Sequence, residues 1–180
     1  MKFYINQLQT GTTSDAEDLN IIQDIYTNSF CEDERRDFVL FLDLLENEKS
    51  FFVDVIKDEG QTKGFISSWM FDNFRYIEHF AIASNLRGKG LGKKALSAWI
   101  AKSELPVVLE VELPEDDISH KRIVFYQKMG FHCWQIPYIQ PAYAPEKKAV
   151  PMFLMTYGAI DLNSDFERVK NKLHKEVYKL

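Results

Sequence analysis

The sequence predicts a single domain of the mixed α/β (α+β) class, built on a mostly antiparallel sheet of seven strands. Apolar residues alternate in some segments and recur at helical spacing in others, which gives the order β-α-α-β-β-β-α-β-α-β-β and a C-terminal helix. Three successive strands between 51 and 83 are joined by short turns, as in an antiparallel meander. A strand, a glycine-rich loop, a helix and another strand then follow, which indicates a right-handed crossover between parallel neighbours.

The composition of the chain limits the classes of protein to which it can belong. Its 180 residues, 46% of them hydrophobic and 14% aromatic, suffice for one sizeable core. The net charge of −5 offers no overall basic surface for nucleic acid, and no long apolar run predicts a membrane span. Because Cys31 and Cys133 lack metal-ligand spacing and the first residues lack a signal peptide, we expect a reduced, cytoplasmic protein without a bound metal.

The first half of the chain begins with a strand and two helices. The apolar spacing predicts the strand over 3–8, a helix that Ser14 or Asp15 caps and that continues to Phe30, and a second helix over 38–45. The charged connection between the helices, 31–36, is expected either as a solvated loop or as a wall of a substrate cleft. Strand patterns follow at 51–56, 63–71 and 76–83.

The second half alternates between helices and strands. The expected elements are a helix over 91–102, a strand over 107–113, a helix that Asp117 caps and Gly130 ends, strands over 131–139 and 150–157, and an amphipathic helix from Leu162 to Val177. No segment is long enough to be a linker between domains. Residues 1–180 are therefore expected to form one domain, with a core over 1–157 and a C-terminal helical segment over 161–180.

The stretch at 85–94, Asn-Leu-Arg-Gly-Lys-Gly-Leu-Gly-Lys-Lys, has the features of an anion-binding loop. It lies between a strand and a helix N-terminus, where backbone N–H groups lack intrahelical partners and the helix dipole is positive. Its spacing excludes the P-loop and the dinucleotide fingerprint. The pattern R-x-x-G-x-G, formed by Arg87, Gly90 and Gly92, instead resembles the pyrophosphate-binding signature of the GNAT superfamily of acetyl-CoA-dependent N-acetyltransferases.

The segment 122–131, Arg-Ile-Val-Phe-Tyr-Gln-Lys-Met-Gly-Phe, resembles a second signature of this family, in which a tyrosine four residues before Gly-Phe lies beside the thioester. The two motifs and the element order together identify the chain as a member of the GNAT superfamily. The resemblance implies a splayed central strand pair, helices on both faces of the sheet, and direct acetyl transfer from acetyl-CoA to a primary amine in a ternary complex. It leaves open whether the acceptor is a small molecule or a peptide, and whether the protein is a monomer or a homodimer.

The resemblance also implies which residues hold acetyl-CoA. The strand before the loop would bind the pantetheine arm and the acetyl carbonyl through the backbone of Phe80, Ala81 and Ile82. The pyrophosphate would lie on the loop residues Arg87, Gly88, Lys89, Gly90, Leu91, Gly92 and Lys93. Ser119 stands where the family often has an asparagine that contacts CoA. Tyr126 is the expected acid, because its hydroxyl would protonate the departing CoA sulfur.

Two glutamates are candidates for the base that deprotonates the amine, since a primary amine is mostly protonated at neutral pH. Glu110 lies on an apolar strand and aligns with the base of similar ribosomal-protein N-terminal acetyltransferases. Its rival is Glu78, on the strand before the glycine loop and two residues before Phe80. Either carboxylate could instead pair with an arginine such as Arg122 or Arg75. His79 is expected on the opposite face from Glu78, as a buried, hydrogen-bonded histidine rather than a catalyst.

Two other functions remain open from the sequence. A non-catalytic acyl-CoA-binding or sensing domain on the same fold would bind the ligand without turnover. An oligomeric interaction protein would use the C-terminal helix and the aromatic segment 138–143, without affinity for CoA. The joint presence of Tyr126, Glu110 and the R-x-x-G-x-G pattern favours the enzyme.

Overall fold

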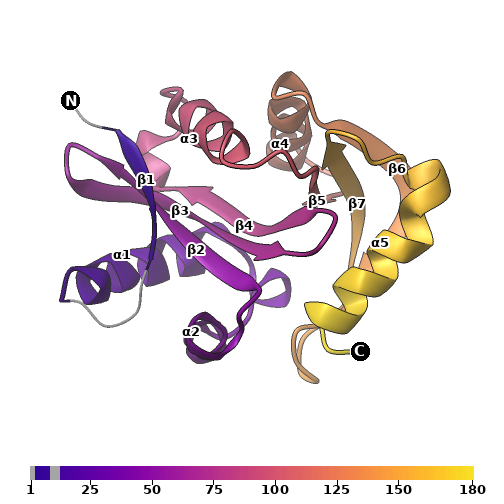
Figure 1. The fold of residues 1–180 in the computed structure, drawn as a ribbon, viewed down its shortest axis with the longest axis horizontal. Coiled ribbons are helices and arrows are strands. Elements are labelled where there is room, and N and C mark those ends of the chain that lie inside the picture. The colour runs from indigo at the N-terminus through magenta and orange to yellow at the C-terminus, as the bar shows by residue number, and fades with distance from the viewer. Residues whose placement is uncertain (1–2, 9–12) are drawn as a thin grey trace.

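The computed structural model of the chain describes residues 3–8 and 13–180, which contain one open sheet of seven strands (Figure 1). The strands lie in the order β1-β2-β3-β4-β5-β7-β6, and all neighbours are antiparallel except β4 and β5. Their bounds are β1 Tyr4–Gln7, β2 Phe51–Asp58, β3 Gln61–Met70, β4 Arg75–Ile82, β5 Val107–Glu112, β6 His132–Gln140 and β7 Val150–Tyr157. The predicted mixed, mostly antiparallel sheet is confirmed.

Helices cover both faces of the sheet, as predicted (Figure 1). They are α1 Thr13–Ser29, α2 Phe38–Asn47, α3 Leu91–Ile100, α4 Asp117–Lys128 and α5 Leu162–Glu176. Buried side chains of α1, α2 and α5 form one apolar core against the sheet, and those of α3 and α4 form a second core on the opposite face. Leu162, Val169 and Leu173 place α5 in the first core, so the C-terminal helix is an integral part of the packing.

The N-terminus of α4 is fixed by a capping box. The Asp116 carboxylate accepts hydrogen bonds from the N–H groups of Ile118 and Ser119, at 2.9 and 2.7 Å. The Ser119 hydroxyl accepts in turn from the Asp116 N–H group at 3.1 Å. The prediction that Asp117 caps this helix is wrong by one residue, because Asp116 is the residue whose carboxylate reaches both free donors.

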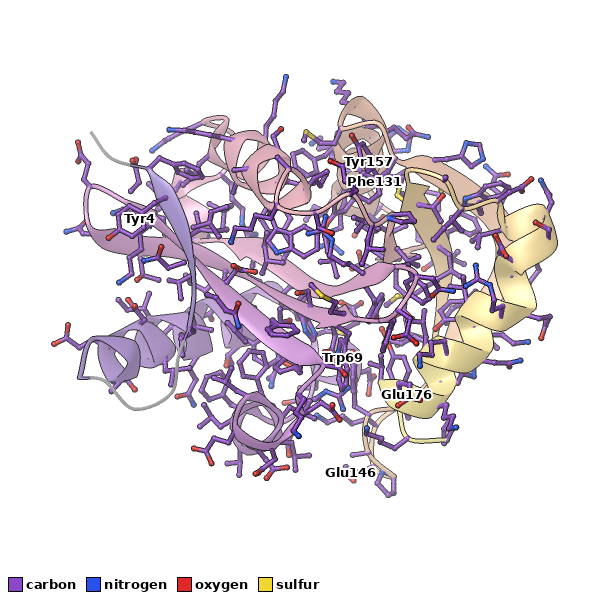
Figure 2. All side chains as sticks on the ribbon, in the orientation of Figure 1. Tyr4, Trp69, Phe131, Glu146, Tyr157 and Glu176 are labelled. Atoms are coloured by element: carbon purple, nitrogen blue, oxygen red, sulfur yellow. The ribbon has the colours of Figure 1, made fainter. Side chains whose placement is uncertain are left out.

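The C-terminus of α4 is a Schellman motif, as the predicted glycine cap requires. Gly130 has the left-handed φ of 91°, and its N–H donates to the Gln127 carbonyl. The next N–H, that of Phe131, donates to the Tyr126 carbonyl at 3.0 Å. Phe131 then packs on Tyr157 of β7, with ring centroids 5.4 Å apart (Figure 2). This cap attaches the end of α4, and Tyr126 with it, to the sheet.

The parallel strands β4 and β5 separate along their length, which confirms the predicted splayed pair. Their register comprises only Arg75↔Val107, Tyr76↔Val108 and Ile77↔Leu109. Beyond these pairs each strand continues without the other, β4 to Ile82 and β5 to Glu112. Main-chain groups on the facing edges are therefore left without a strand partner, and such groups are strong hydrogen-bonding sites for a ligand.

A β-bulge in β4 changes where its polar side chains point. Ser67 of β3 lies opposite His79, but Ser68 lies opposite Ile77, so Glu78 is the extra residue. Glu78 bonds to Trp69 and His79 packs on Tyr26, and both aromatic residues belong to the core that contains α1 and α2. The prediction that Glu78 and His79 lie on opposite faces is wrong, because the bulge interrupts the alternation of the strand.

Two structural features are absent from residues 3–8 and 13–180. None of the helices there combines the length and the apolar character that crossing a membrane requires. Nor does this part of the chain contain a group of three or more histidine, cysteine or acidic side chains arranged to hold a metal ion.

Candidate active site

A cavity of about 640 Å³ occupies the space between the separating strands β4 and β5. Residues 77–82 of β4 and 109–112 of β5 form its two sides. The glycine loop and α4 also line it, together with Glu34 and the ends of α1 and β6. The splay of the two strands thus creates a site that main-chain atoms and side chains line together.

The glycine loop meets the cavity through residues in a left-handed conformation. Gly88 and Gly90 have φ values of 76° and 81°, and Gly90 is the residue that precedes the first turn of α3. The first N–H groups of α3 have no intrahelical acceptor and the helix dipole is positive there, so the loop suits a phosphate. Arg87 donates to the Ile82 carbonyl at 2.9 Å and to the Ser29 hydroxyl at 2.7 Å, which joins the loop to β4 and α1.

Most of the predicted cofactor-binding residues lie together along this cavity. They are Phe80, Ala81, Ile82, Arg87, Gly88, Gly90, Gly92, Lys93 and Tyr126. Lys89 and Leu91 instead line a smaller hollow of about 320 Å³ beside the loop, together with Lys63 and Lys94. Ser119 is not among the lining residues of either space, and its hydroxyl is engaged in the capping box of α4.

Tyr126 lines the cavity from α4. The helix cap fixes its main chain, and its ring packs between Phe125 and Phe131 with centroid distances of 5.2 and 5.5 Å. Burial raises the pKa of Tyr126 to about 12, although the charge of Arg122 acts in the opposite direction. The hydroxyl is therefore protonated at neutral pH and can act as a donor.

Glu110 lines the cavity from β5 and is held by neutral donors. The hydroxyls of Tyr138 and Tyr178 donate to its two carboxylate oxygens, the latter at 2.7 Å. Within the described residues no basic side chain forms an ion pair with it. Burial raises the pKa of Glu110 to about 7, and the tyrosine hydroxyls moderate that rise. The carboxylate can therefore take up and release a proton near neutral pH.

Glu78 is the other candidate base, and both of its carboxylate oxygens already have partners. Arg36 contacts its Oε1 at 2.9 and 3.0 Å, and the indole N–H of Trp69 donates to Oε2 at 2.8 Å. Burial acts to raise the pKa of Glu78, but the positive charge of Arg36, together with His79 and the hydrogen bonds from Trp69 and Tyr143, outweighs it and holds the pKa below its usual range. The arginine partner is thus Arg36, rather than the Arg75 or Arg122 considered from the sequence.

The other two arginines have different partners. Arg122 forms an ion pair with Glu112 at the far end of β5. Arg75 donates to the carbonyls of Trp99 and Ile100 at 3.2 and 3.0 Å. Arg36 was missed because a charged run between helices is normally solvated, and no local signal marks one of its members as buried.

The charged connection 31–36 is therefore a wall of the cavity over part of its length. Its start is exposed, whereas Arg36 is buried and Glu34 lines the cavity. His79 fixes this connection to β4, since its Nε2–H donates to the Glu34 carbonyl at 3.1 Å and its Nδ1 accepts from Ser67 Oγ at 3.2 Å. Burial lowers the pKa of His79, which is consistent with a neutral ring. The predicted buried, hydrogen-bonded histidine is confirmed.

Comparisons with known proteins agree with this geometry. Residues 19–131 match the acetyltransferase (GNAT) family. A structure from Bacteroides thetaiotaomicron, described as an acetyltransferase of the GNAT family, has a TM-score of 0.89 and 35% identity, and the match covers 100% of this chain and 99% of that one.

Two further relatives cover the chain less completely or at lower identity. The protein YjbC of Bacillus subtilis (strain 168), named as an acetyltransferase, is 39% identical over 85 residues; these are 46% of this chain and 43% of YjbC, so the match spans less than half of that protein. A GNAT-family acetyltransferase from Elizabethkingia anophelis, solved with acetyl-CoA bound, has a TM-score of 0.57 at 17% identity over 87% of this chain and 97% of its own. This last likeness concerns the fold alone.

Proposed function

The chain belongs to the GNAT family of acetyltransferases, and we propose that it is an N-acetyltransferase that transfers the acetyl group of acetyl-CoA directly to a primary amine of a small molecule or peptide. The observation that carries this proposal is the cavity between β4 and β5, which brings the glycine loop, Tyr126 and Glu110 into one space. The protein of this fold from Elizabethkingia anophelis has acetyl-CoA bound.

The charges along the cavity suit an anionic cofactor and a cationic acceptor. Two ion pairs, Glu78 with Arg36 and Glu112 with Arg122, neutralise four of the charged side chains in and around it. The remaining basic side chains are Arg87 of the loop, Lys93 of α3 and Lys121 of α4, and the remaining acidic ones are Glu34 and Glu110. We infer that the basic group attracts the phosphates of CoA, while the acidic pair attracts the ammonium group of the acceptor.

Glu110 has the properties of the base that the transfer needs. Its carboxylate would accept one proton from the ammonium group, after which the free nitrogen forms a bond to the acetyl carbon and the carbon–sulfur bond breaks. The second proton that the nitrogen loses then passes to the departing thiolate. A base with a pKa near the working pH is the most effective compromise between being ionised and binding the proton. The pKa of about 7 at Glu110 fits this requirement better than the lowered pKa of Glu78.

Tyr126 would act on the leaving sulfur. Its pKa of about 12 lies above the usual thiol value of about 8.5, so full proton transfer to the thiolate is unfavourable. The hydroxyl therefore contributes chiefly by donating a hydrogen bond to the sulfur as negative charge develops there. The backbone of 80–82, on the open edge of β4, would hold the pantetheine arm.

Thermal unfolding with acetyl-CoA, CoA, NAD and ATP tests the ligand first. At a hundred times its Kd a ligand adds about 2.7 kcal/mol, which for this size raises Tm by roughly 5–10 °C. We expect this rise with acetyl-CoA and CoA alone. A panel of primary amines then tests transfer, with Glu110→Gln and Tyr126→Phe as controls. Acetyl-CoA binding that both variants retain, without turnover of any amine by the parent protein, would favour the non-catalytic acyl-CoA-binding domain.

A further inference from the structure

Tyr178 reaches the active site from the segment that follows α5. Its hydroxyl donates to Oε2 of Glu110 at 2.7 Å, and only 8% of the residue is exposed. Tyr138 donates to Oε1 of the same carboxylate. Each oxygen of Glu110 therefore has its own phenol donor, one from β6 and one from the C-terminal segment 177–180.

Contacts independent of this hydroxyl hold the C-terminal segment in place. Arg36 donates to the Val177 carbonyl at 2.7 Å, and Val177 is fully buried. The Lys179 ammonium group lies 5.6 Å from the centroid of the Trp69 ring. Because Arg36 also pairs with Glu78, one guanidinium joins this segment to β4. The fold itself thus places the phenol, and its position does not depend on the bond to the base.

Tyrosine hydroxyl groups are the main partners that stabilise the ionised Glu110 carboxylate. The groups that face this carboxylate are Tyr76 and Glu78 of β4, Tyr138 of β6, Tyr143 of the β6–β7 connection and Tyr178. His174 of α5 packs on the rings of Tyr138 and Tyr178. Burial raises the pKa of each of these tyrosines above its usual range, so they act as donors. The negative charge of Glu78 opposes ionisation of Glu110, and Arg36 is engaged with Glu78.

We infer that Tyr178 is a positioning residue for the base: with Tyr138, its hydroxyl fixes the plane of the Glu110 carboxylate and leaves the remaining lone pairs for the acceptor amine. The inference rests on the proposed function, in which Glu110 is the base. It makes the C-terminal segment part of the active site, although this segment lies outside the residues, 19–131, that match the family.

The test compares the parent protein with Tyr178→Phe, which keeps the ring and removes only the hydroxyl. The Glu110 carboxyl is followed by NMR of protein labelled with ¹³C in its glutamate side chains, and Glu110→Gln identifies its resonance. We expect the titration midpoint to rise by about one pH unit, because a hydrogen bond to the ionised form is lost. For an amine that the parent acetylates, the acidic limb of the pH profile of kcat/KM should shift to higher pH by the same amount. The substitution should change kcat more than KM.

Val169→Ala provides the structural control, since it removes buried packing from α5 but leaves both phenol donors of Glu110 in the chain. It should lower Tm and leave both midpoints unchanged. An unchanged NMR midpoint in Tyr178→Phe, or an equal shift in Val169→Ala, would overturn the inference. A midpoint that moves in the spectrum but not in the rate profile would overturn the role in catalysis. Absence of turnover by the parent would count against the proposed function, while the spectrum would still measure the coupling of Tyr178 to Glu110.

Discussion

Replacement of Gly92 by alanine should stabilise the fold and weaken the binding of acetyl-CoA. Gly92 is the second residue of α3, and an added methyl group would lie 3.7 Å from Ile82 and Phe80 and 3.9 Å from Phe125. These are ordinary van der Waals distances, so the fold accepts the methyl group without strain. Alanine also loses less conformational entropy than glycine in a helix, which favours the variant by about 0.5 kcal/mol near a helix end. The expected rise in Tm without ligand is about 1–2 °C.

The same methyl group would enter the space in which we place the pyrophosphate. Gly92 lines the cavity, and the three side chains nearest to the added atom line it too. A phosphate kept from its closest approach would lose at least one hydrogen bond to a backbone N–H group. Such a bond to a charged group contributes about 1.5–3 kcal/mol, which corresponds to a Kd about tenfold to a hundredfold higher.

Thermal unfolding separates the two effects in one experiment. With acetyl-CoA at about a hundred times the parent Kd, the ligand should stabilise the parent by about 2.7 kcal/mol and the variant by only about 0.4–1.4 kcal/mol. The Tm of the parent should then rise by roughly 5–10 °C and that of Gly92→Ala by roughly 1–5 °C. Equal shifts would show that the phosphates do not lie on this loop, and an unliganded variant less stable than the parent would refute the packing argument.

The remaining predictions concern the two carboxylates and the tyrosine of the cavity. Glu110→Gln should lower kcat/KM about 10²–10⁴-fold and leave the calorimetric affinity for acetyl-CoA unchanged. Since the pKa of Glu110 is about 7 in the folded state against an ordinary 4.5, its contribution to stability is complete below pH 4.5 and is lost as pH rises to 7. Denaturant unfolding should show a decrease of about 3 kcal/mol across this window that Glu110→Gln lacks. Tyr126→Phe should lower kcat about 10²–10³-fold with little change in KM, as stopped assays of product would show. Arg36→Met leaves the buried Glu78 without its cation, and the free energy of unfolding should fall by about 3–5 kcal/mol at neutral pH; a loss below 1 kcal/mol would contradict the pairing.

The elements around the cavity could be predicted because their local signals agree with their tertiary packing. The end of α4 is an example, since Gly130 supplies the left-handed turn and Phe131 supplies the apolar contact beyond it. The crossover from β4 through α3 to β5 followed from the glycine loop between two apolar strand patterns. Such signals extend over a few residues and can be read without knowing the rest of the fold.

The bulge at Glu78 could not be predicted, because its cause lies in another strand. The register of β4 against β3 shifts between Ser67 and Ser68, and nothing in the sequence of β4 alone marks the extra residue. Arg36 and Tyr178 were missed for a related reason. They reach the carboxylates Glu78 and Glu110 across 42 and 68 residues of chain, so only the assembled fold brings them together.

The different surroundings of Glu78 and Glu110 support the different tasks that we propose for the two carboxylates. Glu78 holds a cation on one oxygen and an indole N–H on the other, so protonation would cost it both interactions. Glu110 has only neutral donors, and burial, with a smaller contribution from the nearby negative charge of Glu78, raises its pKa to about 7. Two acidic groups whose pKa values are driven apart in one cavity are the usual basis of an acid–base assignment. In this proposal burial accounts for most of the raised proton affinity of Glu110, and the fixed charge of Glu78, which Arg36 holds in place, adds a smaller contribution in the same direction.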